Sequence, residues 1–139
     1  MAALFLSPHL IFSLAFTKHQ CKLMKGNDVT HNHPLSTPPS PEDLYLLVDN
    51  EANSFRTCGK NGTYVLEYSD KISNLPEFNI FENKYLEIQN KLLPSYADAN
   101  GYITSEEELI KFGDAIWEEL FKEYGVKPTF ERRKICVIQ

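Results

Sequence analysis

Apolar residues recur at helical spacing in the second half of the chain. Phe81, Tyr85, Ile88 and Leu92 follow one another at intervals of four, three and four residues, and Pro94 then ends the pattern. Residues at this spacing lie on one face of an α-helix. The segment therefore predicts an amphipathic helix with one buried side.

A second and longer helix is predicted between Ser105 and Gly125. Thr104 or Ser105 can cap its start, the glutamates at 106–108 complement the positive end of the helix dipole, and Gly125 suits a left-handed stop. The apolar face of this helix is wide and comprises Leu109, Phe112, Ile116, Trp117, Leu120, Phe121 and Tyr124. A face of that width predicts contact with more than one neighbouring element.

Strand patterns surround these helices. Residues 54–58 and 63–68 flank a turn that contains Asn61-Gly62, a dipeptide that tolerates the positive φ angles of tight hairpins. We expect a β-hairpin with Tyr64, Leu66 and Tyr68 on one face. Residues 129–138 alternate and then become continuously apolar, which predicts a C-terminal strand buried on both faces. Residues 44–48 fit a short helix and a strand equally well.

These elements predict an α+β fold in which a small antiparallel sheet, made of the hairpin and the C-terminal strand, packs against two amphipathic helices. A chain of 139 residues is long enough for one core. Residues 1–27 contain no acidic side chain, residues 2–16 are mostly apolar, and four prolines stand between 34 and 41. We therefore expect residues 1–41 to be an arm or targeting segment with a proline-rich linker, and residues 42–139 to form a single globular domain.

Charge narrows the class of partner. The formal net charge is −5, which argues against general nucleic-acid binding because phosphate contacts need a basic face. Three widely separated cysteines favour a reducing, cytoplasmic compartment. The preferred function is a small acidic, non-enzymatic interaction domain, an adaptor or inhibitor that binds a protein with a basic surface. Its contacts are expected from Glu106, Glu107, Glu118 and Glu119.

The C-terminus offers an alternative function. Cys136-Val137-Ile138-Gln139 resembles the tetrapeptide that directs farnesylation, and Arg132, Arg133 and Lys134 precede it. The resemblance implies a membrane-targeted accessory protein, lipidated at Cys136 and assisted by the basic residues. A buried C-terminal strand would hide this thiol, so the two hypotheses exclude each other. Membrane contact is expected only with the lipid.

Two groups of residues could hold a metal ion, although no cofactor is expected. Asp98, Asn100, Gly101 and Glu107 resemble the middle and end of an EF-hand calcium loop. Because Tyr96 occupies the first ligand position, the resemblance implies weak calcium binding at most. In the arm, His19, Cys21, His31 and His33 are residue types that zinc accepts, but their spacing matches no established zinc motif.

Catalytic patterns are sparse. The sequence contains no phosphate-binding glycine loop, no Gly-x-Ser-x-Gly elbow and no His-Glu-x-x-His helix. All four histidines precede residue 34, so none is expected in the folded unit. Asp114 and Glu118 lie one helical turn apart and could pair for acid–base work or simply form a polar helix face, and Cys58 is a lone thiol. An enzyme of unrecognised type remains the third alternative.

Overall fold

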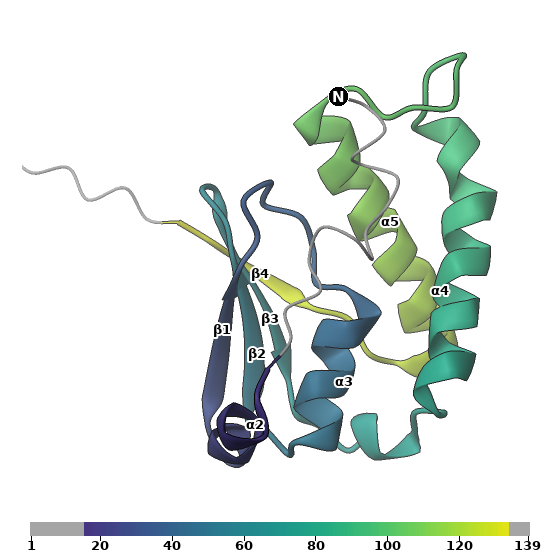
Figure 1. The fold of residues 1–139 in the computed structure, drawn as a ribbon. Helices are drawn as coiled ribbons and strands as arrows, with labels where there is room; N and C mark the ends of the chain where they lie inside the picture. Colours follow the sequence, from purple (N-terminus) through teal and green to yellow (C-terminus); the bar gives the residue numbers. More distant parts are fainter. Residues whose placement is uncertain (1–15, 134–139) are drawn as a thin grey trace, which may run out of the picture.

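The computed structural model describes residues 16–133, which form a mixed four-stranded sheet with helices packed beside it (Figure 1). This is the predicted α+β class, although the sheet is mixed where an antiparallel one was expected. In chain order the main elements are α2 (Lys18–Met24), β1 (Asp28–Asn32), α3 (Pro41–Asp49), β2 (Ser54–Cys58), β3 (Gly62–Glu67), α4 (Phe78–Leu92), α5 (Glu106–Tyr124) and β4 (Thr129–Arg132). Two short 3₁₀ turns lie at Ile72–Asn74 and Leu93–Ser95.

The sheet runs in the order β1-β2-β3-β4. The predicted hairpin is confirmed, since β2 and β3 pair antiparallel and the Gly59 N–H donates to the Gly62 carbonyl at 2.9 Å. Tyr64 and Leu66, which were expected to share one face of the hairpin, are both buried, whereas Tyr68 follows the end of β3 and is exposed. β4 confirms the start of the C-terminal strand, yet its four residues are all exposed, unlike the burial predicted for them. The remainder of that predicted strand lies outside the described residues.

Both predicted helices are confirmed. Phe81, Tyr85 and Ile88 of α4 are buried, and α5 begins at a cap in which the Ser105 hydroxyl accepts from the Glu108 N–H at 3.1 Å. Gly125 ends α5 with a left-handed φ of 72°. The ambiguous residues 44–48 are helical, as part of α3, because Ser40 and Asp43 form a reciprocal capping box at its start and Pro41 suits its first turn.

The structure differs from the expected boundary near residue 41. β1 pairs in parallel with β2, and α3 provides the crossover between the two parallel strands. Pro38 and Pro39 are buried against the rest of the protein, so this proline-rich segment is packed where a stiff linker was expected. The folded unit therefore includes at least residues 28–41.

The core lies between the sheet and the helices. Its most completely buried apolar side chains come from α3, β2, β3, α4, the segment before α5, and α5 itself: Leu44, Leu47, Phe55, Leu66, Phe81, Ile103, Ile116 and Leu120. Within residues 16–133, no helix is both long and apolar enough to cross a membrane.

Candidate metal centre

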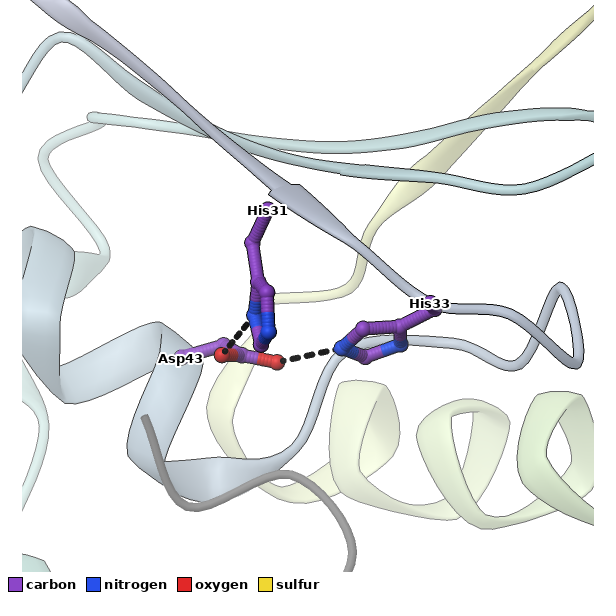
Figure 2. A group of neighbouring side chains, drawn as sticks. All are labelled: His31, His33 and Asp43. Atoms are coloured by element: carbon purple, nitrogen blue, oxygen red, sulfur yellow. Dashed lines mark hydrogen bonds and ion pairs between the residues drawn. The ribbon is translucent and has the colours of Figure 1, made fainter. Parts of the chain in front are cut away.

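Three side chains that commonly bind metal ions meet beneath the sheet. His31 lies on β1, His33 follows that strand directly, and Asp43 lies in the first turn of α3 (Figure 2). All three are buried, and one ligand atom from each lies within 4.8 Å of the others. His31 Nδ1 is 3.2 Å from Asp43 Oδ1, and His33 Nε2 is 3.3 Å from Asp43 Oδ2. The two imidazoles thus address different oxygens of one carboxylate.

Local structure explains why the histidines converge. Side chains two residues apart on an extended chain point to the same side, and the intervening Asn32 is exposed. His31 pairs in register with Thr57 of β2, and the His33 N–H donates to the Cys58 carbonyl at 2.9 Å. This backbone pairing continues past the end of β1 and fixes both imidazoles on the side of the sheet that faces α3.

The third ligand is positioned by the start of α3. The Ser40 N–H donates to Asp43 Oδ2 at 2.9 Å, and the Asp43 N–H donates to the Ser40 hydroxyl at 3.3 Å. Asp43 is therefore a capping residue and a member of the cluster at once. This double role holds its carboxylate in one orientation toward the histidines.

The segment between His33 and Asp43 is anchored to α5. The Trp117 indole nitrogen donates to the Pro39 carbonyl at 2.9 Å, in a buried contact. One turn earlier, Gly113 packs against the Pro38 ring so closely that an added Cβ would lie 2.8 Å from its Cδ atom. A helix near the other end of the chain thus fixes the loop that joins the ligands.

Asp43 is ionised at neutral pH. Burial raises the pKa of this carboxyl, but the hydrogen bonds with His31 and His33, the attraction to His33 and the Ser40 N–H together outweigh burial and lower it to about 2. A carboxylate that is both buried and charged needs positive charge or donated hydrogens nearby. The cluster is therefore built around a fixed negative charge.

The contacts of His33 call for positive charge between the ring and the carboxylate. Its Nδ1 lies 2.9 Å from the Thr37 carbonyl oxygen, which can only accept, so Nδ1 carries a hydrogen; the Thr37 hydroxyl is farther away, at 3.4 Å. A neutral ring would then turn the Nε2 lone pair toward Asp43, which also only accepts. Either a proton or a metal cation at this position resolves the conflict.

Two imidazoles and one carboxylate are ligands that zinc accepts. The described part of the chain brings no fourth histidine, cysteine or acidic side chain into this group. Three protein ligands with one open position are typical of catalytic zinc sites, whereas structural sites are closed by four. The arrangement can therefore supply three protein ligands to one ion.

The zinc group suggested by the sequence is only partly assembled. His31 and His33 come together, which corrects the expectation that no histidine lies in the folded unit. His19 is exposed on α2 and Cys21 is half-buried there, and neither belongs to the cluster. Asp43 was missed because its place after Ser40-Pro41 explained it as a helix cap. The His-x-His spacing followed by a capping Ser-x-x-Asp is the pattern that could have revealed the site.

The calcium-like loop has local roles for two of its residues. The Asp98 carboxylate accepts from the backbone N–H groups of Asn100 and Tyr102, at 2.9 and 3.0 Å, as in an Asx turn. Glu107 pairs with Lys111 at 3.2 Å. Calcium binding by Asp98, Asn100 and Glu107 stays a prediction.

The carboxylates expected to meet a basic partner all have lysine neighbours. Glu106 pairs with Lys60, Glu107 with Lys111, Glu118 with Lys127 and Glu119 with Lys122. These surface pairs are weak enough to exchange, so the interaction-domain hypothesis stays a prediction. Arg132 and Arg133 are exposed, whereas Lys134 and Cys136 lie outside the described residues. The lipidation hypothesis is likewise untested.

The two remaining sequence candidates lie elsewhere. Asp114 accepts a hydrogen bond from the Tyr64 hydroxyl at 2.8 Å, and Asp114 and Glu118 line an open pocket beside β4. Cys58 is half-buried, and the Thr63 hydroxyl lies 3.6 Å from its sulfur. Comparison with models of known families, with curated proteins and with solved structures finds no match to this chain.

Proposed function

We propose that the protein binds one zinc ion through His31, His33 and Asp43 and uses it for hydrolysis. The observation that carries this proposal is geometric: His33 Nε2 lies 3.3 Å from the Asp43 carboxylate, while His33 Nδ1 lies 2.9 Å from the Thr37 carbonyl oxygen. A cation between the two groups satisfies both. His31, which lies on β1 two residues before His33, supplies the third donor.

The supporting contacts resemble those that tune metal ligands. A ligating histidine usually gives its other ring hydrogen to a carbonyl or carboxylate, which fixes the tautomer and the ring orientation. The Thr37 carbonyl does this for His33. The Ser40 N–H holds Asp43 in the same way, and the edge of the Phe55 ring limits the rotation of His31 at a centroid distance of 6.1 Å.

Hydrolysis is the chemistry that a zinc ion with three protein ligands and an open fourth position supports. A zinc ion with three protein ligands lowers the pKa of its bound water to about 7 and so supplies a nucleophile at neutral pH. The chain contributes a water-poor setting, because His31, His33 and Asp43 are 6%, 1% and 2% exposed. Charge interactions are stronger in such surroundings than in bulk water.

Metal content tests the binding step. The full chain, purified without added chelator, is expected to contain one zinc per molecule by inductively coupled plasma mass spectrometry. Asp43→Asn should lose the metal, because the amide has no charge to offer, while it keeps an oxygen for the Ser40 N–H. His19→Gln is the matched control and should keep full zinc content, since His19 lies outside the cluster. Equal metal content in both variants would refute the proposal.

Cobalt substitution tests the open position without knowledge of a substrate. Cobalt(II) replaces zinc in such sites and gives visible absorption that depends on its coordination. Adding azide should change this spectrum if the three protein ligands leave a fourth position that an exchangeable ligand can take. A cobalt spectrum that azide does not change would show a closed site, and the hydrolytic part of the proposal would fail even if zinc binds.

A further inference from the structure

An open pocket of about 740 Å³ lies between α5 and β4. Ligand sites commonly fall in the range of about 300–1,000 Å³. The walls come from the loop that follows His33, the β2–β3 turn, β3, α5 and β4: Ser36, Lys60, Asn61, Tyr64, Ile110, Asp114, Glu118, Pro128, Phe130, Arg132 and Arg133. None of these residues belongs to the proposed metal centre.

The acidic and the basic side chains of the pocket lie at different ends. Ile110, Asp114 and Glu118 follow one another at intervals of four residues on one face of α5, which places the two carboxylates toward the C-terminal end of that helix. Arg132 and Arg133 lie at the opposite end, beside the hairpin turn, where the Arg133 N–H donates to the Asn61 carbonyl at 3.0 Å. The pocket thus has an acidic end and a basic end.

Some of these charges are already compensated. Lys60 pairs with Glu106 at 3.1 Å, and Glu118 pairs with Lys127 at 2.8 Å. Among the residues that the structure describes, Asp114 receives only the neutral Tyr64 hydroxyl, and Arg132 and Arg133 form no ion pair. One carboxylate and two guanidinium groups therefore remain available to a ligand.

An aromatic wall joins the two ends. The Tyr64 and Phe130 rings meet edge to face at a centroid distance of 4.9 Å, across paired positions of β3 and β4. Phe130 also packs over Gly62, where an added Cβ would lie 2.5 Å from the ring. The glycine lets the ring lie flat against the sheet, and Arg132 projects from the same side of β4 as Phe130.

A buried hydroxyl also belongs to the wall of the pocket. Ser36 is 3% exposed, and its Oγ has no hydrogen-bond partner among the residues that the structure describes. Its backbone has a positive φ of 56°, which is uncommon for serine. A buried polar atom without a partner is costly. A Cβ added at Gly59 would clash with this Oγ atom, so the hydroxyl packs against the β2–β3 turn.

We propose that the pocket binds a basic α-amino acid, either free or as the C-terminal residue of a peptide. The guanidinium or ammonium group pairs with Asp114, the aliphatic stem lies on Phe130, and the α-carboxylate meets Arg132 and Arg133. Arginine–carboxylate pairs are often bidentate, and a cation near an aromatic face gains further attraction. Partial burial raises the pKa of Asp114, and a bound cation would compensate for that desolvation.

Nuclear magnetic resonance titration of the full chain tests each part of this ligand. Nα-acetyl-L-arginine carries the cation and the carboxylate, whereas agmatine lacks the carboxylate and Nα-acetyl-L-citrulline lacks the cation. We expect Nα-acetyl-L-arginine to shift the amide resonances of Tyr64, Asp114 and Phe130, and each truncated probe to bind at least about tenfold more weakly. Equal affinity for the three probes, or no shift at these residues, would overturn the proposal.

Variants keep the test independent of any one probe. Asp114→Asn and Arg133→Gln should each weaken Nα-acetyl-L-arginine binding by about tenfold or more, while Asp70→Asn, an exposed carboxylate outside the pocket, should not. Tighter binding of L-arginine than of its acetyl form identifies the free amino acid, and the reverse order identifies a peptide C-terminus. Unchanged affinity in both pocket variants would exclude this ligand class.

Discussion

The indole nitrogen of Trp117 and the carbonyl oxygen of Pro39 form a hydrogen bond across 2.9 Å, although the two residues are 78 positions apart in the chain. Trp117 lies on α5, and Pro39 lies in the loop between His33 and Asp43. The bond connects the C-terminal helix directly to the proposed metal centre. Residues far from the ligands in sequence should therefore affect metal binding.

Trp117→Phe should weaken both the fold and the site. The substitution leaves the Pro39 carbonyl without its indole donor, and a buried acceptor that loses its partner costs about 1–3 kcal/mol. Denaturant unfolding should show this loss, and competition with a zinc chelator should show weaker metal binding. Phe121→Leu on the exposed side of α5 is the control. If Trp117→Phe bound zinc as tightly as the wild type, the hydrogen bond from α5 would not contribute to metal binding.

Gly113→Ala tests the same connection through packing. Alanine ordinarily stabilises a helix interior by about 0.5–1 kcal/mol relative to glycine. Here the added Cβ would lie 2.8 and 2.9 Å from two atoms of the rigid Pro38 ring, so the loop must move. We expect a net loss of about 1–3 kcal/mol in unfolding free energy and weaker zinc binding.

A second substitution checks this explanation. In the Pro38→Ala background the ring is absent, and Gly113→Ala should then cost less than it does alone, which a double-mutant cycle measures. Additive effects of the two changes would show that the clash with Pro38 is not the cause.

The capping serines allow stability and metal binding to be separated. Ser40→Ala should cost about 1 kcal/mol, because the Ser40 hydroxyl caps α3, and it should also weaken zinc binding since Asp43 belongs to the same capping box. Ser105→Ala removes the cap of α5 at a similar cost in stability. We expect its zinc affinity to remain unchanged. Parallel losses of zinc affinity in both variants would mean that the effect is global.

Much of the fold could be predicted because the ends of its helices and strands carry residues with strong local conformational preferences. Asn61-Gly62 marks the hairpin, and Ser105 and Gly125 mark the ends of α5. β1 was missed for the opposite reason. Val29 is its single apolar residue, and the side chain that it buries is His31. A strand whose inward position is polar carries no hydrophobic alternation, and only the tertiary structure shows what that position faces.

The sequence indicates only part of the candidate metal centre. The sequence indicates His31 and His33 as candidate zinc ligands, but it groups the nearby His19 and Cys21 with them because distance along the chain is the only guide that a sequence offers. The prolines at 38 and 39 were expected to oppose packing, yet they lie against α5 and carry the loop from His33 to Asp43. That contact joins segments that are far apart in the chain, so no local sequence pattern predicts it.

The pH dependence of stability should reveal Asp114. Partial burial raises its pKa above the ordinary 3.8, the Tyr64 hydrogen bond lowers it in part, and repulsion from Glu118 raises it again, although the side chain reaches solvent. A raised pKa favours the protonated form in the folded state. The stability from Asp114 is therefore fully present below pH 3.8 and is lost as the pH rises through the folded-state pKa.

Melting temperatures of the wild type and Asp114→Asn, measured from about pH 3.5 to about pH 7, test this sign. The wild type should lose stability relative to the variant as the pH rises. Asp70→Asn, a change at an exposed carboxylate outside the pocket, is the control substitution. The prediction would be contradicted if the difference in melting temperature between the wild type and Asp114→Asn stayed constant with pH. A change in the opposite direction would contradict it as well.

His31 lies on the sheet and Asp43 lies on a helix, so a metal ion bound to both would join these two parts of the fold. An ion bound to both would act as a cross-link between the two layers, across a separation of 12 positions in the chain, and it would stabilise the folded state because the unfolded chain does not bring these ligands together. Removing the ion should therefore speed amide hydrogen exchange in β1 and α3 and leave α4 largely protected. The same three side chains would then serve both the chemistry and the cohesion of the N-terminal half of the fold.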